Sequence, residues 1–192
     1  MLRRHLEMFD TIQRLVGEID AEVAALLEPF RRQVELLDTI PGVDVATAEV
    51  IIAEVGVDMS RFPTAAHLVS WAGLSPRSDE SAGKRRNTRV GKGGQWLKAT
   101  LVQAAWAATR KKDSHIQRLF LRIKGKRGPK KAAIAVAAEI LRSAWYMLAR
   151  DQEYREPDLV AADPARKERE AKRLVQKLKK LGYEVEMPVA AK

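Results

Sequence analysis

The sequence predicts a mainly α-helical protein: a long N-terminal coiled-coil helix, a compact helical domain with a helix-hairpin-helix, and a helical tail. Apolar residues repeat at heptad spacing over the first forty residues, at helical spacing from residue 95, and without interruption over 132–138. With 46% hydrophobic and 31% charged residues, the 192-residue chain can bury a core. We expect a connector at 1–38, a helical domain at 39–155 and a tail at 156–192.

The N-terminal segment is predicted to form one long helix with a coiled-coil seam. With Leu2 at heptad position a, nine of the eleven a and d positions up to Leu37 are apolar, and the exceptions are His5 and Gln33. Pro29 is expected to kink this helix near its end. Two partners for the seam stay open: another helix of the same chain, or a second copy of the chain in a homo-oligomer.

A hairpin between two helices is predicted at residues 36–56. An Ile-Pro-Gly-Val turn separates an apolar helix end from a second helix that Gly56 ends, which resembles a helix-hairpin-helix. That motif holds a phosphate oxygen on backbone N–H groups. Asp44 would repel a phosphate and can instead cap the second helix. The sequence leaves a phosphate clamp and a structural hairpin equally open; the candidate DNA-contacting residues are Ile40, Gly42 and Val43.

Residues 76–94 are predicted to be a flexible loop that lies against phosphates. The segment has no hydrophobic periodicity and is rich in glycine and in basic residues. The candidate DNA-binding residues in this loop and just beyond it are Gly83, Lys84, Arg85, Arg86, Arg89, Lys92 and Lys98.

Further helices are predicted on both sides of this loop. Thr64 is a candidate cap for a short helix at 65–71, helices follow at 113–124 and from Pro129, and the tail forms one at 164–181. A helix from Gln95 has an apolar face made of Trp96, Leu97, Thr100, Leu101, Ala104, Ala105 and Ala108. We expect core positions, rather than base stacking, for Trp145, Tyr146 and Met147.

Positive charge is concentrated in the middle of the chain, whose net charge is +10. Residues 1–80 carry 7 Lys/Arg and 14 Asp/Glu, residues 81–131 carry 16 and one, and residues 132–192 carry 12 and 10. A block of sixteen cations with one acid cannot pair its charges internally. Nucleic acid is therefore the leading candidate partner, and a solvated basic face is the alternative.

Several classes of function are excluded by composition. Without cysteine there are no disulfides and no thiolate zinc sites, and three isolated histidines form no metal-binding pair. We expect no metal or cofactor bound by this chain. The charged N-terminus is not typical of a signal peptide, and no membrane helix is predicted. We therefore expect a cytoplasmic protein associated with the nucleoid.

From the hairpin onward the chain resembles the family of insertion-sequence transposases that also contains the Piv and MooV DNA invertases. An ordered series of short motifs carries the resemblance, which extends through 101–108 and the tail at 181–185. The motifs are Ile40-Pro41-Gly42-Val43, Arg61-Phe62, Leu74-Ser75-Pro76, Glu80-Ser81-Ala82-Gly83-Lys84-Arg85-Arg86, Lys92-Gly93 and Trp96-Leu97-Lys98.

The resemblance implies the C-terminal half of a two-part recombinase. Such transposases have an N-terminal RuvC-like domain with an Asp-Glu-Asp-Asp metal set, a coiled-coil connector, and a helical domain whose serine attacks DNA. The resemblance places that serine at Ser81 and residues 1–38 on the connector. It also implies DNA and a structured guide RNA as partners, and Mg²⁺ only together with the acidic domain. We expect a fragment that receives the RuvC-like domain from another polypeptide.

The cationic block predicts DNA binding, and the resemblance implies a transposase domain in which Ser81 attacks a DNA phosphate. The hydroxyl needs a base or a metal to take its proton, and nearby cations would stabilise the charge on the phosphate oxygens. Asp79 and Glu80 are close in sequence, but the sequence does not assign either as the base. Two alternatives stay open for the chain, a non-catalytic helix-hairpin-helix module for DNA or RNA and a coiled-coil assembly factor with an acidic partner. An ordinary turn serine is the alternative for Ser81.

Overall fold

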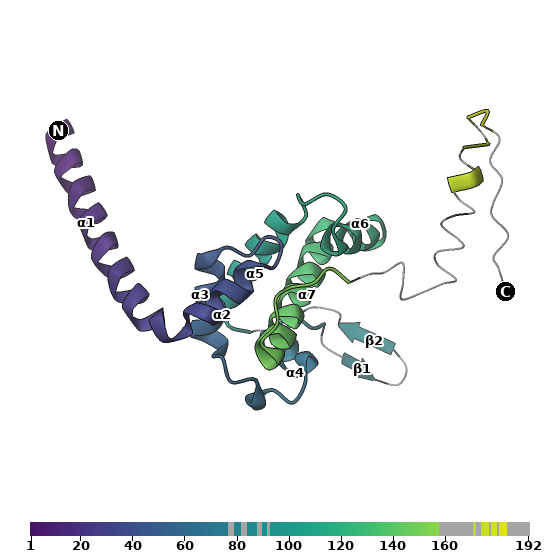
Figure 1. Cartoon of the computed structure of the whole chain (residues 1–192), viewed down its shortest axis with the longest axis horizontal. Coiled ribbons are helices and arrows are strands. Elements are labelled where there is room, and N and C mark those ends of the chain that lie inside the picture. Colours follow the sequence, from purple (N-terminus) through teal and green to yellow (C-terminus); the bar gives the residue numbers. More distant parts are fainter. Residues whose placement is uncertain are drawn as a thin grey trace. The chain divides into compact units, whose positions relative to one another are not determined.

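The computed structural model describes residues 1–76, 79–81, 84–87, 90–91 and 93–157, and in the tail residues 171, 174–176, 178–179 and 181–183. The chain separates into two compact units, Met1–Tyr154 and Arg155–Lys192. The first unit is mainly helical and contains the hydrophobic core (Figure 1). The predicted fold class, a long N-terminal helix followed by a helical domain, is confirmed.

The predicted N-terminal helix is interrupted at its proline. Helix α1 spans Leu2–Leu27, a 3-10 turn η1 spans Glu28–Phe30, and α2 spans Arg31–Asp38. Pro29 lies in η1, where its missing N–H and its ring end the α-helical ladder, as the sequence predicts. None of the 26 residues of α1, all of them described, is buried. Helix α2 by contrast buries Val34, Leu36 and Leu37.

Helix α3, Val45–Val55, follows the hairpin and begins at the predicted cap. Asp44 Oδ1 accepts the Thr47 N–H at 2.9 Å, so the capping role that the sequence left open is confirmed. Hydrogen bonds from the Thr47 side chain and N–H lower the pKa of the Asp44 carboxyl. Gly56 ends the helix with φ +79°, a conformation that glycine adopts without strain.

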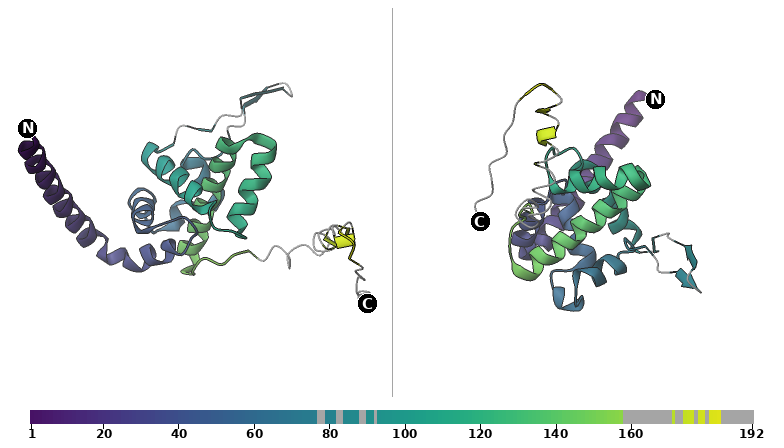
Figure 2. Two further views of the ribbon diagram at one scale, coloured as in Figure 1. Left: turned by 90° about the horizontal axis from the view of Figure 1, so that it is seen from above. Right: turned by 90° about the vertical axis from the view of Figure 1, so that its right-hand side faces the viewer.

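Helix α7, Pro129–Arg150, is the centre of the core. Helices α2, α4 (Ala65–Trp71), α5 (Gln95–Ala108) and α6 (His115–Arg127) each contact it, as does the 3-10 turn η2 (Met59–Arg61) (Figure 2). Small side chains along α7 let these helices approach closely. Its buried residues are Ala132, Ala133, Val136, Ala137, Ala138, Ile140, Leu141, Ala144 and Met147.

By length and composition, α7 is also the one helix among the described residues that could cross a membrane. The sequence predicts no such helix, because charged residues stand at both ends of its apolar stretch and within it. Nine residues of α7 are buried against the helices that surround it. Core packing therefore accounts for its apolar character without a membrane.

Three expectations about single side chains are wrong. Thr64 occupies the cap position of α4, but its hydroxyl hydrogen-bonds His67 Nδ1 at 2.8 Å and caps no backbone N–H. Trp96 is 80% exposed, although the rest of the predicted α5 face is largely buried and its neighbour Leu97 is fully buried, so the Trp96 side chain lies on the side of the helix that faces away from the core. Tyr146 lies at the surface, where the Arg150 guanidinium sits 5.0 Å from its ring. Its neighbour Met147 is buried as predicted.

The second unit is the tail. At the described positions 171, 174–176 and 178–179 the chain is helical, in agreement with the helix predicted at 164–181. Gly182 has φ +88°, suited to the helix end that the sequence places there. The predicted cap at Asp163 and the extended segment at 184–186 lie outside the described residues.

Candidate nucleic-acid interface

The segment that carries the candidate serine forms a two-stranded antiparallel ribbon. Strand β1 spans Asp79–Ser81 and β2 spans Lys84–Asn87, and Ser81 pairs with Lys84 at the end where the two strands join. A register shift between the Asp79 and Glu80 pairs leaves Arg86 as an extra residue in β2. The predicted flexible loop is therefore wrong for these residues, since backbone pairing forms strands without any alternation of apolar side chains.

The ribbon continues toward the helical domain. Pro76 pairs with Val90, three residues before Asp79 and three residues after Asn87, so this pair keeps the register of the lower part of the ribbon. Two-stranded ribbons are marginally stable alone. What holds the base of this ribbon therefore decides where Ser81 is presented.

Two glycines join the base of the ribbon to the helical domain. A Cβ built on Gly93 would lie 2.1 Å from Ala72 O, and one built on Gly73 would lie 2.5 Å from Gly93 N. Gly73 also has φ +67° at the end of α4. The two backbones are thus in direct contact, which fixes the start of α5 against the end of α4. Sequence reasoning missed this contact; glycines on both sides of the cationic segment were the available signal.

Lys98 has a structural role at the same place. Its Nζ donates a hydrogen bond to Gly91 O at 3.2 Å, and the side chain is half-buried. This bond links the first turn of α5 to Gly91, which follows the Pro76–Val90 pair at the base of the ribbon. The predicted DNA contact of Lys98 stays a prediction, and its ammonium retains two further donors.

The other candidates of the cationic segment lie partly within the described backbone. Ser81 belongs to β1, and Lys84, Arg85 and Arg86 belong to β2, so the ribbon brings the serine and three cationic positions together. Their DNA contacts stay predictions. The remaining candidates, which lie outside the described residues, are Gly83, Arg89 and Lys92.

The hairpin turn packs into the domain. The side chains of Ile40 and Val43 are buried, and the Val43 N–H donates to Ile40 O at 3.0 Å. Gly42 has φ +85°, and a Cβ there would lie 2.4 Å from Ala108 N and 2.5 Å from Ala104 O. The turn therefore rests on the backbone of α5. This geometry favours the structural hairpin over the phosphate clamp for these three residues, whose DNA contact remains untested.

A second group of cations lies on α6 and on the turns at its two ends. All ten of these side chains are exposed. The residues are Arg110, Lys111, Lys112, Arg118, Arg122, Lys124, Lys126, Arg127, Lys130 and Lys131. The sequence assigned these residues to the basic block without choosing any of them as a contact.

Histidine and acidic side chains are the candidate metal ligands in the described part of the chain. Within it, no group of three or more histidine or acidic side chains lies close enough to hold a metal ion.

Comparison with known proteins finds a family match over this part of the chain. Residues 34–120, from α2 into α6, match the sequence model of a transposase family, and the match includes the ribbon and its base. That family is described as the IS116/IS110/IS902 transposase family.

Two curated relatives are similar to parts of the chain. The chain is 39% identical over 90 residues to the "Insertion element IS110 uncharacterized 43.6 kDa protein" of Streptomyces coelicolor, covering 46% of this chain and 22% of that protein. It is 28% identical over 144 residues to the "Transposase for insertion sequence element IS1111A" of Coxiella burnetii, covering 73% of this chain and 39% of that protein. The chain thus spans about a fifth to two fifths of the length of these relatives.

Proposed function

We propose that this chain is the DNA-binding, serine-bearing part of a transposase that acts in DNA transposition and recombination. The observation that carries the proposal is the ribbon inside the matched region, where Ser81 pairs with Lys84 next to two arginine positions. Cations beside a nucleophile are what phosphoryl transfer needs, because they stabilise charge on the phosphate oxygens. The base of the ribbon holds this group of residues on the helical domain.

The proposed reaction is transfer of a DNA phosphoryl group to the serine. A bond forms between Ser81 Oγ and phosphorus, the bond from phosphorus to one deoxyribose oxygen breaks, and that oxygen leaves and takes up a proton. The serine proton goes to a general base. We propose that this base belongs to a RuvC-like acidic domain, which is also where Mg²⁺ would bind. The Piv-type serine mechanism and the guide RNA are parts of the same proposal.

Ser81→Ala is expected to abolish covalent attachment of DNA. The full chain would be mixed with the acidic domain and with DNA carrying the insertion-sequence ends, and adducts measured on denaturing gels. Ser75→Ala is the matched control, since it removes a hydroxyl at the start of the same segment and should leave adduct formation unchanged. Equal adduct in wild type and Ser81→Ala would refute the nucleophile assignment.

A non-catalytic binding module is the second candidate, favoured by the many cations and by the absence of an acidic triad among the described residues. It predicts no adduct from wild type. Reversing the charge of Lys84, Arg85 and Arg86 would still weaken binding and reduce its salt dependence. The two candidates therefore differ in the adduct assay and agree in the binding assay.

We also propose that α1 pairs with a second copy of the chain. Its heptad residues Phe9, Ile12 and Ile19 are 58%, 54% and 59% exposed, so no described residue of the chain covers this part of the seam. A long apolar stripe in water favours association. The heptad spacing selects another helix of the same kind as the partner.

Ile12→Asp with Ile19→Asp is expected to dissociate this assembly, because two carboxylates per chain would be placed in the apolar seam. Thr11→Asp with Ala21→Asp is the control, since both positions lie outside a and d. Sedimentation equilibrium should give at least twice 21.5 kDa for wild type and control, and 21.5 kDa for the seam variant. A wild-type mass of one chain at micromolar concentration would contradict the proposal.

A further inference from the structure

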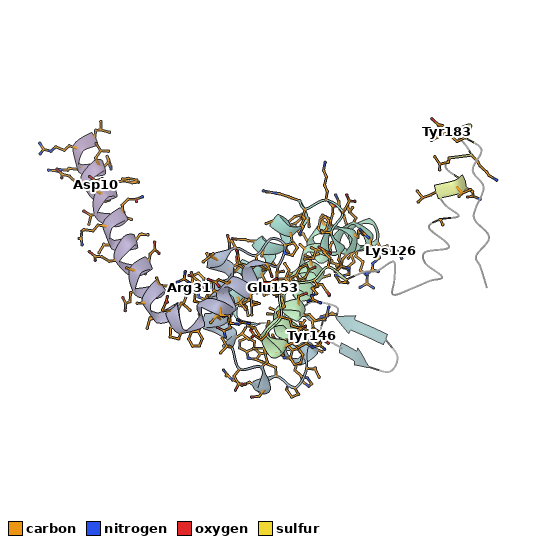
Figure 3. All side chains as sticks on the ribbon, in the orientation of Figure 1. Asp10, Arg31, Lys126, Tyr146, Glu153 and Tyr183 are labelled. Atoms are coloured by element: carbon orange, nitrogen blue, oxygen red, sulfur yellow. The ribbon has the colours of Figure 1, made fainter. Side chains whose placement is uncertain are left out.

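Helix α6 and the start of α7 carry a positive surface that is separate from the ribbon. Residues 114–138 contain seven Lys/Arg and no Asp or Glu. All seven side chains are exposed. The α6–α7 basic surface consists of Arg118, Arg122, Lys124, Lys126, Arg127, Lys130 and Lys131, and Figure 3 labels Lys126 on α6.

Three of these cations form a stripe along α6. Arg118, Arg122 and Lys126 follow one another at four-residue spacing, so they lie on one side of the helix at steps of about 6 Å. Ile116 and Phe120 are buried on the side that faces the core. Like charges at this spacing repel one another and weaken a helix. The stripe therefore costs stability unless an anion lies along it.

The helix dipole explains only part of the surface. Lys124, Lys126 and Arg127 lie in the last turn of α6, where cations are favourable. Lys130 and Lys131 lie in the first turn of α7, where the positive end of the dipole repels them, and no acidic residue stands in that turn to compensate. Stability alone does not account for two lysines at this position.

Acidic neighbours among the described residues do not neutralise the surface either. Arg118 donates to the backbone carbonyl of Asp113 at 2.8 Å. Glu139, the next acid along α7, pairs with Arg142 and lies 3.7 Å from His115 Nε2. Within the described part of the chain, no ion pair or side-chain hydrogen bond is made by Arg122, Lys126, Arg127, Lys130 or Lys131.

We propose that the α6–α7 basic surface is a second nucleic-acid site, which holds the sugar–phosphate backbone of a duplex in addition to the site at the ribbon. Backbone contact rather than base stacking follows from its chemistry, because the surface offers long cationic side chains on two rigid helices and the one aromatic residue of α6, Phe120, is buried. The duplex can be DNA or the stem of a folded RNA. The inference rests on the proposed function in that both require nucleic-acid binding.

The test compares two variants of the full chain, each with four cations replaced by glutamine. The surface variant carries Arg122→Gln, Lys126→Gln, Lys130→Gln and Lys131→Gln. The control carries Arg3→Gln, Arg4→Gln, Arg14→Gln and Arg31→Gln, which lie outside heptad positions a and d and change the net charge equally. Binding to duplex DNA and to an RNA hairpin of equal length would be measured by fluorescence anisotropy from 50 to 300 mM salt.

The surface variant should bind at least one of the two nucleic acids more weakly. The slope of log Kobs against log salt should fall by about 2 to 4, because each lost phosphate contact contributes about 0.9. The control should keep the wild-type slope. The nucleic acid for which the slope of log Kobs falls, DNA or RNA, is the one that binds this surface.

Two outcomes would overturn the inference and can be told apart. Equal slopes for surface variant, control and wild type, with a loss only after charge reversal in β2, would exclude this surface and leave the proposed function standing. If the wild type bound neither nucleic acid, both the second site and the proposed function would be refuted. Lys130→Gln with Lys131→Gln alone serves as a second variant if the fourfold one unfolds, and it should lower the slope by about 1 to 2.

Discussion

Gly42→Ala is expected to lower the free energy of unfolding by about 2 to 5 kcal/mol. A left-handed backbone costs about 1 to 2 kcal/mol for alanine, and Gly42 has φ +85°. Inserting a methyl group into packed structure adds about 1 to 3 kcal/mol. The added Cβ would meet Ala108 N at 2.4 Å and Ala104 O at 2.5 Å, and both atoms belong to the backbone of α5, which cannot rotate away as a side chain would.

Gly128→Ala is the matched control for this prediction. Gly128 has φ +83°, close to the φ of Gly42, but its added Cβ would meet no described atom within 4 Å. It should therefore lose only the conformational part, about 1 to 3 kcal/mol, because φ +83° with ψ 166° is a conformation that almost only glycine adopts. Urea denaturation of both variants separates backbone strain from contact. Equal losses at the two positions would mean that the hairpin does not pack against α5 as described.

The result also bears on how the hairpin functions. A phosphate clamp needs its turn at the surface, whereas Gly42 in contact with α5 makes the turn a support for the helix that begins at the base of the ribbon. A large loss of stability in Gly42→Ala favours the structural hairpin over the phosphate clamp. The sequence alone left these two alternatives equally open. The hairpin then acts on Ser81 only by holding α5 in place.

Local signals predicted the helices. Asp44 and Gly56 mark the ends of α3 by capping, Pro29 and Pro129 mark breaks and starts through the missing N–H, and apolar spacing marks α5. Each of these signals acts within a few residues. These signals can therefore be recognised in the sequence without knowledge of the fold.

The features that sequence reasoning missed depend on contacts between distant segments. The position of Gly93 against Ala72 is visible only when two helices are brought together, and the ribbon has no alternating pattern because neither face of β1 or β2 covers the core. Trp96 fits a helical period, but only the fold shows that its side chain faces away from the core while Leu97 beside it is buried. The hydrogen bond from Lys98 to Gly91 O is likewise seen only in the fold, while the DNA contact of Lys98 stays a prediction.

Gly93→Ala is expected to detach the base of the ribbon. Its Cβ would lie 2.1 Å from Ala72 O and 2.3 Å from Ala72 C, so the end of α4 and the start of α5 must separate, at a cost of about 1 to 3 kcal/mol in the free energy of unfolding. Gly94→Ala is the control on the adjacent residue. There the nearest atom, Glu54 Oε2, would be 3.6 Å away, which is ordinary contact, and stability should change little.

Gly93→Ala should also weaken DNA binding under conditions where the protein is still folded. The comparison is made without urea, at a temperature where both variants are folded. Gly93→Ala should then show faster amide exchange in β1 and β2 and weaker DNA binding than Gly94→Ala. The reason is that the cations of β2 are no longer held on the helical domain. The α6–α7 basic surface is untouched by this change, so part of the salt dependence should persist. Wild-type exchange and affinity in Gly93→Ala would show that the glycine contact does not position the serine-bearing ribbon.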